Sequence, residues 1–200
     1  MRSQLYFLVI ILFISCNRRN DIKNVSPSEN LIQKLSDSTL NRIVKKNILD
    51  SVYLKTVTLQ NDSLKNELLL EISYQYLKLR DSISFLNANQ VARNFSNQIK
   101  DSSGLAASQW DLAHFYHTYN KEDSAYYYYN KAQKIYQDLG DEYNSASLLL
   151  NMAIIQKNIK DYTGSEVSTT NAITLLKPLK EYSQLYAAYN NLGIIFGKLE

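Results

Sequence analysis

One stretch decides the fold of this chain: residues 105–140, LAASQWDLAHFYHTYNKEDSAYYYYNKAQKIYQDLG. Apolar and small residues recur at helical spacing in both halves: Leu105, Leu112, Ala113 and Tyr116 in the first, and Ala125, Tyr129, Ala132 and Tyr136 in the second. The polar residues 120–123 predict a turn, and Asn120 or Asp123 is a candidate cap for the second helix. The stretch therefore predicts a helical hairpin whose apolar surface needs neighbours.

Copies of this hairpin recur along the chain with a 40-residue period. The first helix has one apolar and one small column: Ile72, Leu112, Met152 and Leu192, followed directly by Ser73, Ala113, Ala153 and Gly193. A third column is aromatic except at its third member: Tyr76, Tyr116, Gln156 and Phe196. The second helix and the hairpin ends follow the same step: Ala92, Ala132 and Ala172, and Asp101, Asp141 and Glu181. Self-similarity at this period predicts an all-α array of helical hairpins.

Six residues of the opening hairpin also stand at a characteristic mutual spacing: Leu112, Ala113, Tyr116, Ala125, Tyr129 and Ala132. In these small and aromatic positions the copy resembles the tetratricopeptide repeat (TPR) family. The last copy, YNNLGIIF at residues 189–196, has the N-L-G form common in longer members of that family. The resemblance covers residues 65–200 and implies a TPR-like helical-hairpin solenoid.

The chain departs from the TPR pattern in two ways. Its 40-residue period is longer than the family's repeat of about 34, which predicts a longer second helix or a longer connection. Ser165 and Thr169 stand where Ala125 and Tyr129 stand one copy earlier. The resemblance does not identify a ligand, because one fold serves many functions.

The N-terminal sequence predicts that the protein is exported from the cytoplasm. Residues 1–15 contain one cation and an apolar run at 5–14, which is shorter than the roughly 20 residues needed to span a bilayer and is typical of a signal peptide. The sequence FISC at 13–16 resembles the lipobox of bacterial lipoproteins, and this resemblance implies lipid attachment at Cys16. The alternative is an ordinary secretory signal with an incidental cysteine. Because the chain has 1 cysteine, no internal disulfide can form.

Composition divides the remaining chain into three parts. Residues 16–38 are polar and aperiodic, which predicts a flexible tether. Residues 39–61 contain a helical pattern that fits the 40-residue register poorly, so we expect a capping helix or a degenerate repeat. Residues 62–200 form the TPR-like array, which stops inside its last repeat. We therefore expect the sequence to be the front portion of a longer protein or a truncated reading frame.

Composition and motifs do not indicate an enzyme or a nucleic-acid binder. The formal net charge is only +3, and the sequence contains no phosphate-binding loop, CxxC, HExxH or nucleophile elbow. His114 and His117 are the 2 histidines of the chain, fewer than the ligands that a transition metal needs. We expect no catalytic residue, cofactor or metal. Most of the 16 tyrosines are expected in the core, although the run at 126–129 must expose at least one ring.

The resemblance to TPR proteins implies that the first helix of each hairpin lines a partner-binding groove. The family's groove positions fall on eight residues of this chain: Tyr74, Trp110, His114, His117, Ile154, Lys157, Asn190 and Ile194. This mixed lining suits an extended peptide, whose apolar side chains dock while amides hold its backbone. The alternative is that Trp110 packs against the next hairpin and both histidines are solvated.

Two functional hypotheses follow. The first is a membrane-anchored, periplasmic scaffold that binds a protein or peptide. By resemblance to exported bacterial TPR proteins it would form the sensing end of a signalling protein, with a histidine kinase or DNA-binding output. The absence of an acidic run at residues 17–20 favours a periplasm-facing anchor over the cell surface. The second is a glycan- or nutrient-binding surface lipoprotein that uses exposed tyrosines.

Overall fold

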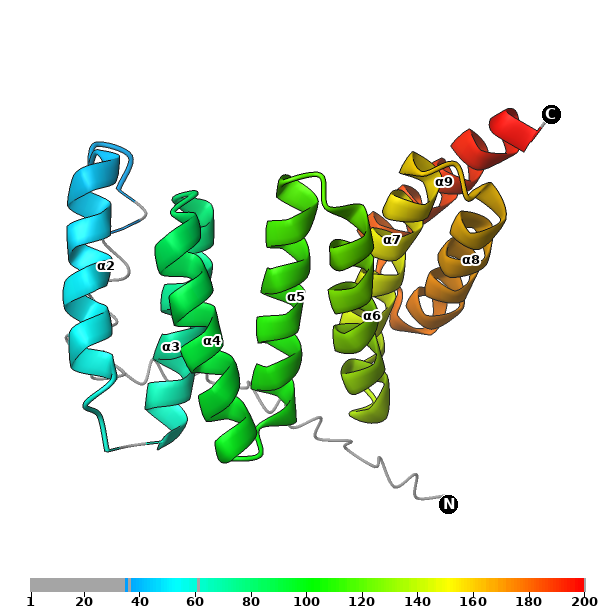
Figure 1. Ribbon diagram of the computed structural model, residues 1–200. Helices are drawn as coiled ribbons and strands as arrows, with labels where there is room; N and C mark the ends of the chain where they lie inside the picture. Colours follow the sequence, from blue (N-terminus) through cyan, green and yellow to red (C-terminus); the bar gives the residue numbers. More distant parts are fainter. Residues whose placement is uncertain (1–34, 36, 61, 200) are drawn as a thin grey trace, which may run out of the picture.

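The computed structural model describes residues 35, 37–60 and 62–199. This part contains eight helices and no strand: α2 (Arg42–Thr56), α3 (Asp62–Lys78), α4 (Ser82–Gln98), α5 (Ser102–Thr118), α6 (Glu122–Asp138), α7 (Glu142–Asn158), α8 (Tyr162–Leu179) and α9 (Tyr182–Leu199). Consecutive helices follow one another in a row that starts with α2 at the left of Figure 1. At the right-hand end of the row, α9 is inclined to α2 and α5, which stand upright in this view. The predicted all-α helical-hairpin solenoid is confirmed.

The helix lengths explain the 40-residue period. Helices α3 to α7 are each 17 residues long. From α3 onward the helices begin at positions 62, 82, 102, 122, 142, 162 and 182, so each helix with its connection takes up half of the period. The two helices of a hairpin are therefore about equally long and the connections are short. The extra length is therefore shared by both helices of a hairpin and is not confined to the second helix or to a connection.

The same turn recurs between the helices from α3 to α9. One residue per turn adopts a left-handed conformation: Arg80, Lys100, Asn120, Gly140, Lys160 and Lys180. The next residue donates its amide to the carbonyl five positions back, as from Asp101 to Ser96 at 2.8 Å and from Asp141 to Tyr136 at 2.9 Å. This hydrogen bond is the signature of a Schellman motif, which satisfies the last carbonyls of a helix.

Most of these turns also start the next helix. The side chains of Asp81, Asp101, Asp141 and Asp161 accept a hydrogen bond from the backbone amide three residues on. Helix α6 differs, because its N-cap is Lys121 and makes no side-chain capping bond. The predicted caps of this helix are wrong: Asn120 is the left-handed turn residue, and Asp123 lies within the first turn. There its carboxylate favours the positive end of the helix dipole.

Burial follows the 40-residue register, including α2. The three buried residues of α2, Leu49, Val52 and Thr56, lie 40 positions before residues of α4 that are also buried: Asn89, Ala92 and Ser96. Helix α2 thus occupies the position of a second helix within the segment 39–61. Its poor fit in sequence arises because burial is retained while the residue types change.

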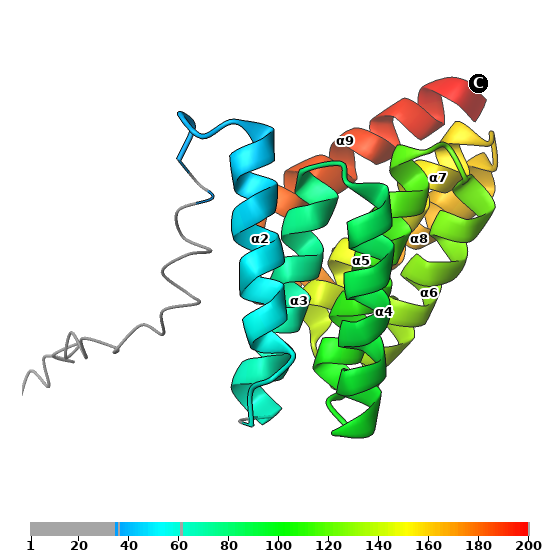
Figure 2. The same ribbon diagram turned by 60° about the vertical axis from the view of Figure 1, so that its left-hand side comes forward.

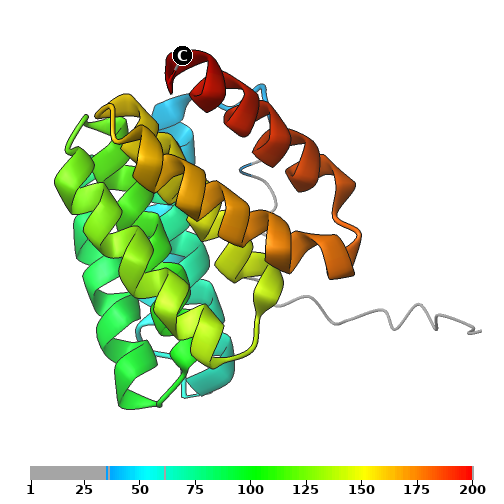
Figure 3. The same cartoon turned by 90° about the vertical axis from the view of Figure 1, so that its right-hand side faces the viewer.

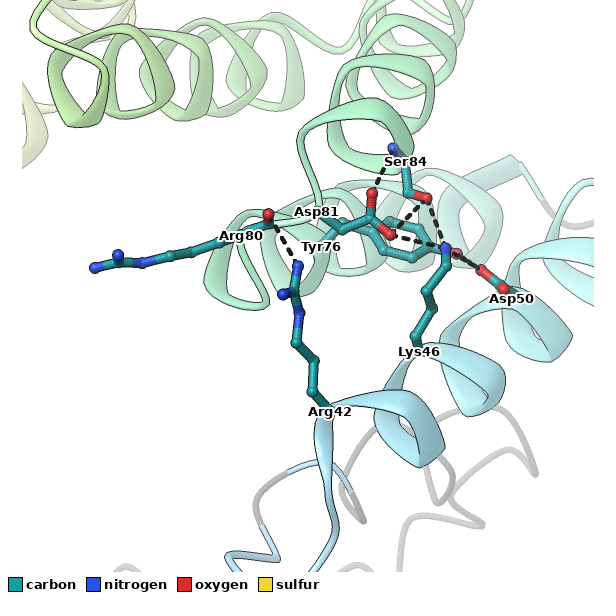
Figure 4. A network of polar contacts seen from close by, with 7 residues as sticks. All are labelled: Arg42, Lys46, Asp50, Tyr76, Arg80, Asp81 and Ser84. Atoms are coloured by element: carbon teal, nitrogen blue, oxygen red, sulfur yellow. Dashed lines mark hydrogen bonds and ion pairs between the residues drawn. The ribbon is translucent and has the colours of Figure 1, made fainter.

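A polar network fixes α2 to the turn between α3 and α4 (Figure 4). The Lys46 ammonium lies 2.8 Å from an Asp81 oxygen and 3.3 Å from an Asp50 oxygen, and it donates to Ser84 at 2.8 Å. The Tyr76 hydroxyl donates to Asp50 at 2.7 Å. The hydrogen bond to Asp81 raises the pKa of Lys46. This end of the array is therefore held by charge as well as by apolar contact.

The predicted signal peptide (1–15), the predicted lipid attachment at Cys16 and most of the predicted tether (16–38) lie outside the described residues. Across 35, 37–60 and 62–199, no helix combines the length and the hydropathy needed to cross a bilayer.

The hydrophobic core continues along the array in three clusters, centred on α3–α4, on α5–α6 with α7, and on α8–α9.

Candidate partner-binding groove

The eight predicted groove residues lie on four helices that we call the first helices: α3, α5, α7 and α9. Contacts join neighbouring members of this set directly, between α3 and α5 and between α7 and α9. Figure 2 shows the row of helices from another side, with α9 running across its far end. We call the surface that carries the eight residues the groove face.

Trp110 is partly buried and packs against neighbouring aromatic rings. Its ring stacks on His114 at 6.1 Å between centroids and meets Tyr136 of α6 edge-on at 6.1 Å. The indole nitrogen is buried and has no hydrogen-bond partner within the described chain. Trp110 is therefore only partly available to a ligand, and it packs against a core cluster that contains residues of α5, α6 and α7.

The two histidines have separate partners. His114 Nδ1 lies 2.9 Å from the hydroxyl of Tyr129 in α6, and His117 Nδ1 lies 2.9 Å from a carboxylate oxygen of Glu122. Burial, with a smaller effect from the neighbouring His117, lowers the pKa of His114. Neither ring is fully solvated. No group of three His, Cys, Asp or Glu side chains suited to a metal occurs among the residues that the structure describes.

Tyr74, on α3, stands apart from the other predicted residues. Its side chain is exposed, and the Lys78 ammonium lies 5.5 Å from the centroid of its ring. A cation over an aromatic face is a favourable but weak surface contact. Tyr74 thus offers an accessible ring at the α3 end of the groove face.

The four remaining predicted residues lie together. Ile154 and Lys157 of α7 and Asn190 and Ile194 of α9 line one open pocket of about 220 Å³. Three residues that sequence reasoning missed complete its lining: Leu150, Ala187 and Asn191. In Figure 3 this part of the array is seen with α9, in red, at its edge. The pocket combines aliphatic walls with amides and one cation.

Asn191 organises the floor of this pocket. The Lys157 ammonium donates to its side-chain oxygen at 2.7 Å, and its side-chain nitrogen donates to the hydroxyl of Thr169 in α8 at 2.8 Å. Asn191 is buried, whereas Ile154 and Ile194 are 40% and 42% exposed. A fixed amide and cation therefore lie beside two accessible isoleucines.

The sequence contained a signal for Asn191. The position directly before the predicted apolar column is polar in every copy: Glu71, Asp111, Asn151 and Asn191. Asp111 is partly buried on α5. Burial, with a further contribution from the Glu71 carboxylate, raises the pKa of Asp111 to about 7. This polar column is a signal for Asn191 in the sequence, although Asn191 is not among the family's groove positions.

Comparison with known proteins supports the class of fold. The crystal structure of BtubC (BKLC) from P. vanneervenii is similar to this chain with a TM-score of 0.69 and 18% sequence identity, over 84% of this chain and 68% of that one. At this identity the similarity concerns the fold alone. No protein-family model matches the sequence, and a search of curated proteins finds no match. The chain is thus a helical repeat protein of the all-α solenoid class.

Proposed function

We propose that this chain is a non-catalytic, TPR-type scaffold that binds an extended peptide or protein segment along its groove face. The observation that carries the proposal is the pocket between α7 and α9. Four of the eight groove residues expected from sequence, two on each helix, line one pocket there. Equivalent positions of successive repeats thus meet in a surface that a linear ligand can follow.

The lining chemistry supports a peptide. Ile154 and Ile194 supply exposed apolar surface, which is removed from water when a ligand side chain docks. Asn190 supplies an exposed amide that can donate to and accept from a peptide backbone, while the buried Asn191 holds Lys157 in place. Lys157, which is held by Asn191, supplies a cation for a carboxylate of the ligand. Such alternation of apolar pockets and amides is how grooves recognise extended chains.

The proposal includes the expected location. The scaffold would be a lipoprotein attached to a membrane through Cys16 and facing the periplasm, as the sensing end of a signalling protein. The support is the FISC sequence at residues 13–16 and the polar segment that follows it. Several acyl chains on one cysteine would hold the protein on the bilayer. The Cys16→Ala protein should then leave the membrane fraction, and its retention there would contradict this anchor.

Selection from a random peptide library tests the binding function. The chain should enrich peptides with apolar side chains, and Ile154→Glu or Ile194→Glu should reduce their affinity by about tenfold or more, because a charge replaces docked apolar surface. Ile159→Glu is the matched control, since Ile159 is an exposed isoleucine outside the pocket. If no peptide is enriched, or if all three variants bind equally, the proposed groove is wrong.

A further inference from the structure

A second pocket of about 500 Å³ lies on a different side of α7. It is formed by α6, α7 and α8, and its polar lining comes from six residues: Gln133, Gln137, Glu142, Ser145, Asn171 and Thr174. On α7 it uses Glu142 and Ser145, whereas the groove pocket uses Ile154 and Lys157. Helical geometry separates these two sets onto different faces. The second pocket is therefore independent of the proposed peptide groove.

The lining of this pocket differs from the equivalent positions one repeat earlier. Five lining residues are smaller than the residues found 40 positions earlier: Gln133 for Arg93, Gly140 for Lys100, Ser145 for Leu105, Asn171 for Lys131 and Thr174 for Lys134. The backbone register is the same in both places, since the helices begin at a constant interval throughout. The residues that line this pocket are therefore not repeated in the preceding hairpin, although the backbone register is.

Part of the polar lining is already held in position. The Gln133 amide nitrogen donates to Ser145 Oγ at 3.0 Å and to Gln137 Oε1 at 3.2 Å. In the described chain the amide of Asn171, across the pocket on α8, has no hydrogen-bond partner. One wall is therefore preorganised, and the opposite wall offers a free donor and acceptor.

The lining selects for a neutral polyhydroxylated ligand. Side-chain amides and hydroxyls both donate and accept, and they match the vicinal hydroxyl groups of a sugar ring. Glu142 is the one ionisable residue among the described lining residues, so anions are disfavoured. Leu149 and Leu175 provide apolar surface for the C–H face of such a ring. The volume falls within the roughly 300–1,000 Å³ of small-ligand sites.

We propose that the pocket between α6, α7 and α8 is a binding site for a neutral mono- or disaccharide. It differs from the glycan hypothesis based on exposed tyrosines, because no tyrosine lines it. Recognition rests instead on the amides of Gln133, Gln137 and Asn171. A sugar bound there would leave the groove pocket between α7 and α9 open. The scaffold could then bind a sugar and a peptide at the same time, on two faces of α7.

Titration of the isotope-labelled chain with glucose, N-acetylglucosamine and maltose, followed by NMR, tests this site. At least one sugar should produce saturable shifts of the side-chain amides of Gln133, Gln137 and Asn171, with a dissociation constant on the order of millimolar. Glucuronate should bind more weakly because of Glu142. If no sugar shifts these amides at up to about 50 mM, or if the dipeptide Ala-Ala shifts them as strongly, the proposal is overturned.

Variants copied from the neighbouring repeat locate the site. Asn171→Lys and Thr174→Lys introduce the residues found 40 positions earlier, at exposed positions, and should weaken sugar binding by about tenfold or more. Lys131→Asn makes the reverse change between α4 and α6 and should leave binding unchanged. Equal affinity in all three variants would exclude this pocket. Peptide binding at Ile194 should survive Asn171→Lys, so failure of either proposal can be recognised separately.

Discussion

The α5 part and the α7–α9 part of the groove face use equivalent positions in opposite ways. On α5, His114 lies against Tyr129 and is bonded to its hydroxyl. On α7, Ile154 occupies the equivalent position one repeat later and remains 40% exposed beside a pocket. The α5 part is therefore occupied by its own side chains, whereas the α7–α9 part is open to a ligand.

The difference originates in the second helices. Tyr129 of α6 is long enough to reach across its hairpin to His114, but its counterpart in α8 is Thr169. Thr169 bonds instead to Asn191 of α9 at 2.8 Å. The residue on the second helix thus decides whether a groove position packs or stays accessible. A repeat register alone does not distinguish these outcomes.

The largest effect is expected from removing the tyrosine that occupies the α5 part. Tyr129→Ala should lower the free energy of unfolding by about 3–5 kcal/mol, because a buried aromatic leaves a cavity. Thr169→Ala, at the equivalent position, should cost only about 1–2 kcal/mol through its lost hydrogen bonds. Urea denaturation of both variants measures the difference. Equal costs would mean that the two hairpins are stabilised in the same way.

The helix crossing in the α5–α6 hairpin should tolerate little extra volume. Ala132 is fully buried, and Ala132→Leu should destabilise the chain by about 1–3 kcal/mol through overpacking. Lys131→Leu is the control, because Lys131 is an exposed neighbour on the same helix. Thermal denaturation compares the two. A similar loss in both variants would contradict the 40-residue register.

Asp111 and Asn191 occupy one column of the repeat, and they predict different pH dependence. The pKa of Asp111 is about 7 in the folded chain against an ordinary 3.8, so the folded state binds more protons between these values. Stability should then fall as pH rises from about 4 to about 7. Asp111→Asn, which introduces the residue found at Asn191, should remove this slope and raise the stability at pH 8. An unchanged slope in urea denaturation would refute this assignment.

The turns should give the smallest effect. Lys160 has a φ of 66° and Gly140 a φ of 70°, a conformation that is costly for residues with a Cβ atom. Lys160→Gly should therefore stabilise by about 0.5–1 kcal/mol, and Gly140→Ala should destabilise by about 1 kcal/mol. No atom lies within 4 Å of a Cβ added at Gly140, so steric contact cannot explain a loss there. Chemical denaturation measures both, and a loss on Lys160→Gly would contradict the turn assignment.

Much of the fold was predictable because burial and chain direction repeat with the sequence. The hairpin of residues 105–140 appears as α5 and α6, and its apolar columns lie in the core. The turns were harder to predict, because glycine occupies only one of the six left-handed positions and the others carry Arg, Lys or Asn. The usual glycine signal for a helix end is therefore missing.

The candidate site was predictable only in part. Register located Ile154, Lys157, Asn190 and Ile194 on adjacent helices, and these four line one pocket. The packing of Trp110 depends on Tyr136, whose side chain comes from another helix and whose reach is a matter of size and rotamer. Helical spacing contains no such information. Sequence reasoning therefore identified the groove positions but could not tell which of them remain accessible.

The recurring turn has a consequence for how such a chain changes length. Each junction from Arg80 to Lys180 ends one helix and begins the next with nearly the same backbone path. Cutting the gene at Asp101 and Asp141, which are both N-cap residues, and joining the ends would remove one whole hairpin and restore the same junction. Duplication at these points would lengthen the chain equally simply. The array can thus be shortened or lengthened by whole hairpins, and each hairpin removes or adds a part of the binding surface.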